Sequence, residues 1–350
     1  MTVSRMCCII VGKTRYKMRK FITICLIILL MLALCACASS PAQGGGEDAK
    51  LRIAATVFPA YDFTRQIAGE RAEVTLLVPP GSESHSYEPT PQDMLLLKDC
   101  ALLVANGGES EAWLDSVADG LDGNVPILRM LDCVTALEEE TREGMQSGGI
   151  LSRAHGHDTH AHTGHEHDGH DEHEEEFDEH VWTSPANAVE ICRAICARLC
   201  AADPAAAEYY RGNFRDYSAK LSALDAEFRA AVDAAPGRTL IFADRFPVRY
   251  FVEEYGLDYY AAFPGCADDA EPSARTVAFL IDKVRAEGVR AVFYIEFSNE
   301  KMADIICEET GCEKLLFHSC HNVSADELRA GVGYLDLMEQ NLASIKEALG

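Results

Sequence analysis

Apolar and polar positions follow two different periods along residues 51–350. Short runs of β-branched and aromatic residues predict strands, and stretches with apolar residues three or four apart predict helices. The predicted strands are 51–57, 74–78, 101–105 and 125–128, then 239–243, 257–262, 291–295 and 314–317. The predicted helices are 61–69, 91–97, 111–118, 185–200, 248–255, 273–287, 300–309 and 334–349. Because strands and helices alternate, we expect an α/β protein with parallel sheets covered by helices.

One stretch between the two halves keeps a helical period over an unusual length. It begins at Asp203-Pro204 and ends before Pro236-Gly237. The apolar residues that define its face are Tyr209, Phe214, Tyr217, Leu221, Leu224, Phe228 and Val232. A continuous helix here would be about 45 Å long at 1.5 Å per residue. The pattern therefore predicts an N-terminal lobe over 51–200 and a C-terminal lobe over 237–350, joined by a rigid connecting helix over 201–236.

The N-terminal segment has a different character. Six basic residues precede the first acidic one, and an apolar run over 21–34 follows. That run is shorter than the roughly 20 residues that cross a bilayer, and with its basic flank it is typical of a secretory signal. The next residues, Leu34-Cys35-Ala36-Cys37-Ala38-Ser39, resemble a bacterial lipobox with Cys37 as the lipidated residue. A plain cleaved signal or a short anchor helix is the alternative.

A signal and lipobox at the N-terminus predict an extracytoplasmic location. Residues 1–37 are expected to be a lipoprotein signal peptide, and residues 38–50 a tether rich in serine, glycine and glutamine. The mature protein is then expected outside the cytoplasmic membrane, held to its outer face by lipid.

Charge narrows the possible partners. The chain has 31 basic and 56 acidic residues and a formal net charge of −25; without residues 1–36 the charge becomes −31. No basic patch follows the first twenty residues, so nucleic-acid binding is disfavoured. A hydrophobic content of 48% excludes a disordered acidic tail. The charge favours cations as partners.

Eight of the 12 histidines lie within a tract that is also rich in Asp and Glu. They are His155, His157, His160, His162, His165, His167, His170 and His173. The surrounding region, 138–179, has few apolar residues and predicts an exposed flexible loop. Imidazoles and carboxylates on such a chain bind zinc weakly and repeatedly. We hypothesise that the loop collects zinc for a central site or senses its excess; a solvated linker without a role is the alternative.

Four histidines lie outside this tract, and each follows a predicted strand or lies close to one. They are His85, His180, His318 and His321. Ligand-binding residues of parallel α/β sheets gather at the carboxyl ends of strands, and neutral imidazole suits zinc and related ions. A single histidine in such a loop is more often an ordinary surface residue, and spacing alone does not show that the four converge.

Nine cysteines follow Cys37, an odd number, so at least one has no partner within the chain. Cys192, Cys196 and Cys200 fall on one stripe of a predicted helix. We interpret them as buried small hydrophobic residues. A site of three thiolates is the alternative, but no neighbouring histidine or turn would complete it.

Two segments carry a resemblance to a known family. Residues 79–89 read Pro-Pro-Gly-Ser-Glu-Ser-His-Ser-Tyr-Glu-Pro, and residues 178–185 read Asp-Glu-His-Val-Trp-Thr-Ser-Pro. Both resemble hallmark motifs of the solute-binding lipoproteins of zinc and manganese ABC importers, and the resemblance extends over residues 50–350. It implies the helical-backbone metal receptor fold, with one metal ion between two lobes and ligands at His85 and His180. Zinc-type members also carry a His-rich loop, for which residues 155–179 are the counterpart.

The C-terminal lobe departs from the family pattern. Ala243 or Asp244 stands where the family usually has its third histidine. His318 and His321 lie near the family's last ligand, so we expect one of them to replace the missing histidine, with Asp244 or Glu296 as alternatives. His318 lies nearer the family position, but the choice between the two stays open. Nitrogen-rich ligation favours Zn²⁺ over Mn²⁺, which accepts more oxygen ligands.

The predicted function is therefore capture of Zn²⁺ by a monomer and its delivery to the permease and ATPase of an ABC transporter. The resemblance leaves a manganese or iron receptor, or a metal-binding adhesin, as alternatives with the same fold. An enzyme is not expected, because the sequence has no His-Glu-x-x-His helix, nucleophile elbow or Gly-rich phosphate loop.

Overall fold

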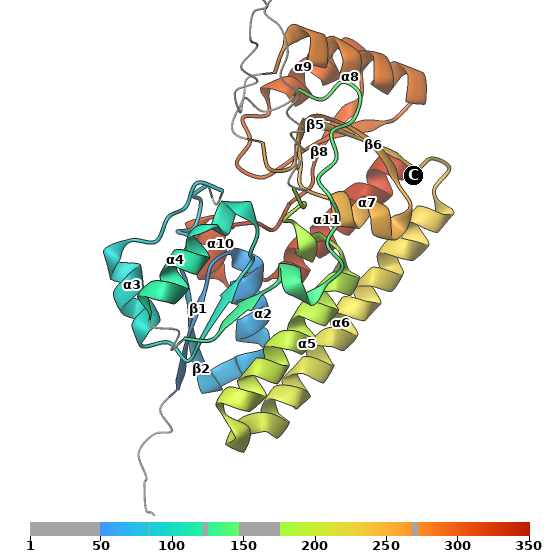
Figure 1. Cartoon of the computed structure of the whole chain (residues 1–350). Coiled ribbons are helices and arrows are strands. Elements are labelled where there is room, and N and C mark those ends of the chain that lie inside the picture. The colour runs from blue at the N-terminus through green and yellow to red at the C-terminus, as the bar shows by residue number, and fades with distance from the viewer. Residues whose placement is uncertain (1–49, 84, 122–124, 147–175, 268–271) are drawn as a thin grey trace, which may run out of the picture. The chain divides into compact units, whose positions relative to one another are not determined.

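Two parallel sheets of four strands each organise the computed structural model, which describes residues 50–83, 85–121, 125–146, 176–267 and 272–350 (Figure 1). The first sheet has the order β2-β1-β3-β4, formed by β1 (Leu51–Ala55), β2 (Ala72–Leu76), β3 (Leu102–Ala105) and β4 (Ile127–Arg129). The second has the order β6-β5-β7-β8, formed by β5 (Thr239–Phe246), β6 (Asp258–Pro264), β7 (Ala291–Tyr294) and β8 (Glu313–Leu316). Every strand pair is parallel, which confirms the predicted α/β class.

Helices connect and cover these strands. They are α2 (Phe58–Ala68), α3 (Pro91–Lys98), α4 (Trp113–Gly120), α5 (Pro185–Ala202), α6 (Ala207–Ala234), α7 (Arg249–Tyr255), α8 (Ala274–Glu287), α9 (Lys301–Thr310), α10 (Ala325–Ala330) and α11 (Tyr334–Leu349). Helix α2 begins three residues before its predicted start, because Val57 leaves the strand as N-cap and Pro59 fits the first turn. Helix α10 was not predicted, although Ser324 and Glu327 form a capping box that the sequence displays.

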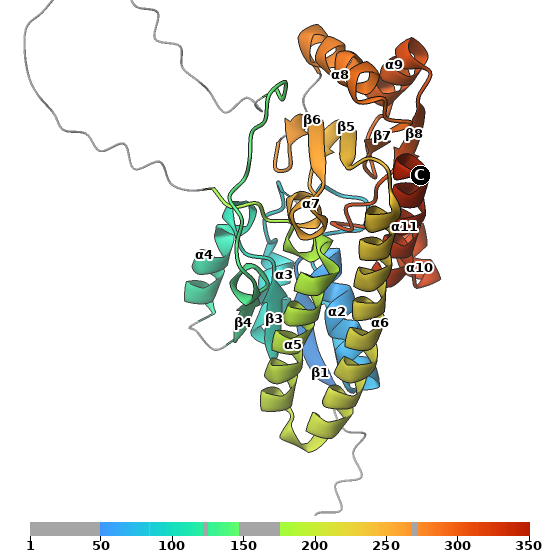
Figure 2. The same ribbon diagram turned by 90° about the vertical axis from the view of Figure 1, so that its right-hand side faces the viewer.

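The predicted connecting helix is α6, whose 28 residues span about 42 Å at 1.5 Å per residue. It packs against α2 and α5 beside the first sheet, and against α7 and α11 towards the second (Figures 1 and 2). Its first buried aromatic residue differs from the prediction: Tyr210 is fully buried, whereas Tyr209 is 41% exposed. Starting from Tyr210 gives an apolar face with regular helical spacing, which the five-residue step from Tyr209 does not.

The long helix is not the sole connection between the sheets. In the segment after β4, Leu137 N–H donates to the Tyr250 hydroxyl (3.1 Å) and Gln146 N–H donates to the Ala262 carbonyl (2.8 Å). In the segment after β8, the His321 carbonyl accepts from Phe58 N–H (3.2 Å). Residues 50–350 accordingly form one compact unit. Several cross-links of this kind favour small movements of loops over a wide hinge opening.

A buried carboxylate joins three helices of this unit. Asp62, on α2, is fully buried. One of its oxygens accepts from the Tyr217 hydroxyl of α6 (3.3 Å) and from Tyr334 N–H at the start of α11 (2.9 Å). The other oxygen accepts from Arg65 (2.9 Å). A carboxylate inside a protein is tolerated only with partners of this kind, so Asp62 fixes how α2, α6 and α11 meet.

The cysteine stripe has the structural role that was predicted for it. Cys192 and Cys196 are buried in the main hydrophobic core, and Cys200 is half-buried beside them. Within the described residues, no helix has the length and apolar character that crossing a membrane requires. The expected signal peptide, Cys37, residues 38–49 of the expected tether and the eight histidines of the loop lie outside the described residues.

One buried acid predicts a pH dependence of stability. Glu111 is 5% exposed, and burial raises its pKa from 4.5 to about 7, although hydrogen bonds such as that from Gly107 N–H oppose the shift. The carboxyl therefore keeps its proton longer in the folded chain. Its contribution to stability is complete below pH 4.5 and is lost as the pH rises through 7. Compared with Glu111→Gln, the wild type should lose about 3 kcal/mol of unfolding free energy between pH 4.5 and 8. Urea denaturation at a series of pH values measures this difference, and parallel curves for the two proteins would contradict it.

Candidate metal centre

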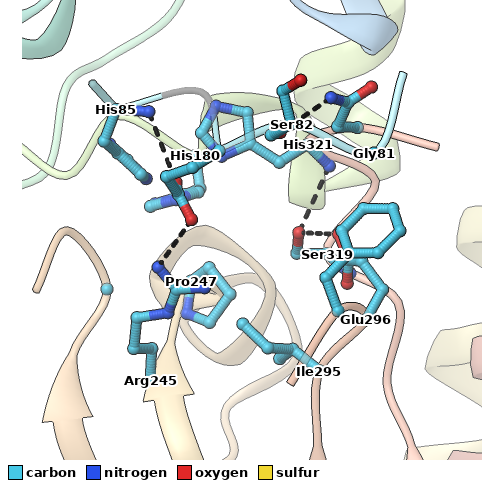
Figure 3. A pocket seen from close by; sticks show the side chains of 14 residues that line it. Gly81, Ser82, His85, His180, Arg245, Pro247, Ile295, Glu296, Ser319 and His321 are labelled. Carbon is cyan, nitrogen blue, oxygen red and sulfur yellow. Dashed lines mark hydrogen bonds and ion pairs between the residues drawn. The ribbon is translucent and has the colours of Figure 1, made fainter. Parts of the chain in front are cut away.

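Three histidines from distant segments converge on one cavity between the two sheets (Figure 3). His85 lies in the loop after β2, His180 directly before the short 3₁₀ helix η4 (Val181–Thr183), and His321 in the segment after β8. One ligand atom of each histidine lies within 4.8 Å of the others. Nitrogens bound to a tetrahedral zinc lie roughly 3.4 Å apart, as Zn–N distances of about 2.0–2.1 Å require. Small ring movements would therefore close the three nitrogens around an ion.

His180 is held by the carboxylate that precedes it in the motif. The ring is 1% exposed, and its Nδ1 lies 3.2 Å from Asp178 Oδ1. The same oxygen accepts the backbone N–H of His180 (2.8 Å), while the Asp178 carbonyl accepts from the Tyr250 hydroxyl (2.8 Å). A carboxylate at Nδ1 fixes the ring and leaves Nε2 for a metal. Burial lowers the pKa of His180, but the charge and hydrogen bond of Asp178, together with the charges of Glu179 and Glu139, raise the pKa above its ordinary value.

His321 is positioned by a short turn at Ser319, which is bonded both to Glu296 and to Trp182. Its backbone N–H donates to Ser319 Oγ (3.2 Å), and Ser319 donates its hydroxyl and its N–H to the Glu296 carboxylate. The Ser319 carbonyl accepts from Trp182 Nε1 (2.8 Å). Trp182 belongs to the same motif as His180, so this motif also holds the turn before His321 in place. The tryptophan ring lies 5.0 Å from the His321 ring, centroid to centroid.

The electrostatics of the other two rings favour their neutral form. Burial and the neighbouring His180 lower the pKa of His85 to about 4. Burial, His85 and His180 lower the pKa of His321 well below its ordinary value. Since a metal binds the neutral imidazole, these two rings offer their nitrogens at neutral pH without first losing a proton.

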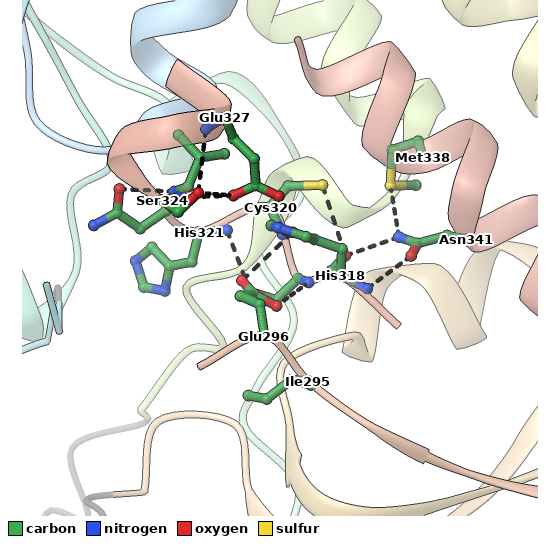
Figure 4. A network of polar contacts seen from close by, with 12 residues as sticks. Ile295, Glu296, His318, Cys320, His321, Ser324, Glu327, Met338 and Asn341 are labelled. Carbon is green, nitrogen blue, oxygen red and sulfur yellow. Dashed lines mark hydrogen bonds and ion pairs between the residues drawn. The ribbon is translucent and has the colours of Figure 1, made fainter. Parts of the chain in front are cut away.

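His318, three residues before His321, points into a different environment (Figure 4). Its Nδ1 accepts Cys320 N–H (2.9 Å), and its backbone N–H and carbonyl are both bonded to the Asn341 side chain. Between the two histidines, Cys320 has a φ of +62°, which reverses the chain and directs the two rings apart. The structure therefore brings His321 to His85 and His180, and it does not bring His318 there.

Of the other two C-terminal candidates, Glu296 lines the cavity and Asp244 does not. Asp244 accepts the N–H groups of Arg245 (2.8 Å) and Ile295 (3.3 Å), so its carboxylate joins β5 to the segment after β7 and does not line the cavity. Arg245 lines the cavity instead, with its guanidinium 3.3 Å from Glu83. Glu296 also lines it. Two residues predicted from the sequence, His318 and Asp244, are thus held away from the cavity by their hydrogen bonds.

The cavity has a volume of about 210 Å³ and room for a fourth ligand beside the histidines. Gly265 also lines the cavity. A larger residue would be crowded there, because its Cβ would lie 2.8 Å from the Phe246 carbonyl oxygen and 3.3 Å from His180 Cε1. Three imidazoles with a carboxylate or water in the fourth position are a donor set suited to Zn²⁺. The chemistry of the residues present therefore fits a zinc ion.

Several residues that hold these rings in place were not predicted from the sequence. Asp178 was readable as part of the motif, but it and Glu179 were counted within an exposed loop, whereas they are 1% and 3% exposed. Ser319 and Gly265 gave no signal, because their roles depend on contacts with Glu296 and His180 that only the folded chain creates.

Comparison with known proteins also points to zinc. The model of the family described as "Zinc-uptake complex component A periplasmic" matches residues 53–348. The high-affinity zinc uptake system protein ZnuA of Bacillus subtilis is 30% identical over 316 residues, covering 89% of this chain and 92% of that protein. The zinc-binding lipoprotein AdcA of Streptococcus pneumoniae is 28% identical over 302 residues, covering 86% of this chain but only 56% of that longer protein.

Among solved structures, the Zn(II)-bound ZnuA-like domain of Streptococcus pneumoniae AdcA is 26% identical, with a TM-score of 0.67, and the match covers 86% of this chain and 99% of that domain. The family match and the Bacillus relative each cover most of the chain. On these grounds the chain belongs to the family of periplasmic component A proteins of zinc-uptake complexes.

Proposed function

We propose that this protein captures Zn²⁺ outside the cytoplasmic membrane and delivers it to the permease of an ABC transporter. The observation that carries the proposal is the convergence of His85, His180 and His321 on one cavity. The relatives of this chain are named for zinc uptake and zinc binding, and the chain is accordingly a solute receptor and not an enzyme. The ion is its cargo.

The arrangement supports zinc in preference to manganese. Imidazole nitrogens are suited to zinc, and Mn²⁺ lies at the weak end of the affinity order of the divalent first-row metals. His85 and His321 are neutral at pH 7, as their lowered pKa values indicate. Asp178 fixes the third ring. Three imidazole nitrogens that are already close together therefore favour Zn²⁺ over Mn²⁺, because Zn²⁺ binds nitrogen more strongly.

Competition between the two ions tests this proposal. The purified protein is titrated with Zn²⁺ in the presence of a large excess of Mn²⁺, with a chromophoric chelator that reports free zinc. We expect tight zinc binding to persist at a thousandfold excess of Mn²⁺, following the affinity order of the metals. Displacement of zinc by manganese would favour the alternative, a manganese receptor. His180→Ala serves as the control, because it should lose the tight site and keep any weak zinc bound by the histidine tract.

The further parts of the proposal concern the remainder of the chain. Cys37 is proposed as the lipid anchor on the outer face of the membrane, with a monomeric protein serving the permease and its ATPase. The histidines between His155 and His173 are proposed to collect zinc for the central site. Deletion of residues 155–176 should reduce the zinc stoichiometry to one tight ion and reduce uptake only at low zinc. Unchanged stoichiometry and uptake would contradict the collecting role.

A further inference from the structure

A second set of potential metal ligands lies beside the three histidines and shares His85 with them. One ligand atom each of His85, Glu179 and Cys266 lies within 4.8 Å of the others. His85 Nδ1 is 4.0 Å from Glu179 Oε2. The three residues come from the loop after β2, the residue before His180 and the loop after β6, so the fold creates this set from distant segments, as it creates the first.

The surroundings of this set are rich in acidic groups. Glu179 is 3% exposed and Asp178 is 1% exposed, and Glu139 accepts Cys266 N–H (3.0 Å). The Glu179 carboxylate accepts from Ser110, whose N–H lies 2.9 Å away. Among the ion pairs of the described residues, no lysine or arginine pairs with Glu139 or Glu179. Buried carboxylates without a counter-ion are unfavourable, and a divalent cation would supply the missing positive charge.

The ligand types indicate which cation would bind. Imidazole, carboxylate and thiolate all bind Zn²⁺, whereas a thiolate is a poor ligand for Mg²⁺, Ca²⁺ and Mn²⁺. On binding, the Cys266 thiol would release its proton to solvent as its sulfur bonds to the metal. Glu179 directly precedes His180, so an ion held here would be next to the three-histidine cluster.

We propose that His85, Glu179 and Cys266 form a second position for a thiophilic divalent cation, adjacent to the three-histidine cluster. His85 belongs to both sets, so the two positions compete for it and the second binds more weakly. That the ion passes through this position on its way to or from the cluster rests on the proposed function. The existence of the position does not.

Cobalt(II) is a suitable probe because a thiolate bound to it gives a near-ultraviolet charge-transfer absorption that histidine and carboxylate ligands do not give. The mature protein is used whole, since its histidine tract is silent in this band. In His321→Ala, which removes one ligand of the cluster, we expect the first equivalent of Co²⁺ to produce the charge-transfer band. In His321→Ala/Cys266→Ser the band should be lost. Cys133→Ser, a change at another half-buried cysteine, should leave it unchanged.

The outcomes separate this proposal from the proposed function. A band that is absent from His321→Ala at saturating Co²⁺, or that survives Cys266→Ser, overturns the second position. In the wild type, the first equivalent of Co²⁺ should give visible d–d absorption without the charge-transfer band, because the tighter three-histidine cluster contains no thiolate. If the first equivalent already gives the charge-transfer band in the wild type, the second position stands and the proposed function fails.

Discussion

Replacing His321 by alanine is expected to abolish tight zinc binding, with a dissociation constant at least about a thousandfold higher. The change removes one of three nitrogens that lie within 4.8 Å of one another. Loss of a partner that merely orients a ligand already costs about 10–100-fold in metal affinity, and loss of the ligand itself costs more. Titration against a chelator of known zinc affinity measures the effect. Circular dichroism checks that the variant is folded.

The matched control is His318, three residues earlier. Its Nδ1 accepts Cys320 N–H and does not face the cavity. His318→Asn places an amide oxygen where it can accept the same N–H, so zinc affinity should stay within a few-fold of the wild type while stability falls slightly. Tight binding retained by His321→Ala and lost in His318→Asn would show that the ligand is His318, as the family position had suggested.

Removal of the Asp62 carboxylate is expected to give the largest loss of stability. Asp62→Ala leaves the buried Tyr217 hydroxyl and Tyr334 N–H without an acceptor, and Arg65 without its ion pair. Each of the two buried groups left unsatisfied costs about 1–3 kcal/mol. The partly exposed Arg65 can turn to water, so its lost ion pair adds about 1 kcal/mol or less. We expect the free energy of unfolding to fall by about 4 kcal/mol, as measured by urea denaturation.

Two further variants show whether the effect arises from the junction of helices. Arg65→Ala leaves the fully buried Asp62 charge without its cation, although Tyr217 and Tyr334 still donate to it, and it should cost about 3 kcal/mol. Tyr217→Phe removes one buried donor and should cost about 1 kcal/mol. A loss below about 1 kcal/mol for Asp62→Ala would contradict the role of this residue in joining α2, α6 and α11.

The fold was predictable because local signals agreed with the tertiary structure. Strand and helix periods identified both sheets, and the apolar face of α6 followed from Tyr217, Leu221, Leu224 and Phe228. The first turn of α6 was misassigned because Tyr209 and Tyr210 are adjacent aromatic residues, and only packing against the neighbouring helices decides which is buried.

The candidate site was predictable in part. The two motifs, each of which is continuous in the sequence, led to His85 and His180. The choice between His318 and His321 depended on the positive φ of Cys320, a backbone conformation that nothing in this cysteine's chemistry signals. Asp244 was named from its place in the chain, but its carboxylate bonds to Arg245 and Ile295. Cys266 and Glu179 are neighbours of His85 only through tertiary packing.

We expect His85, His180 and His321 to bind one Zn²⁺ ion together. A crystal structure of the zinc-loaded mature protein, with anomalous scattering recorded at the zinc absorption edge, tests it most directly. We predict that the strongest anomalous peak lies about 2.0–2.1 Å from one nitrogen of each of these three rings. A strongest peak bound by His318 or Asp244, with His321 away from the metal, would contradict it.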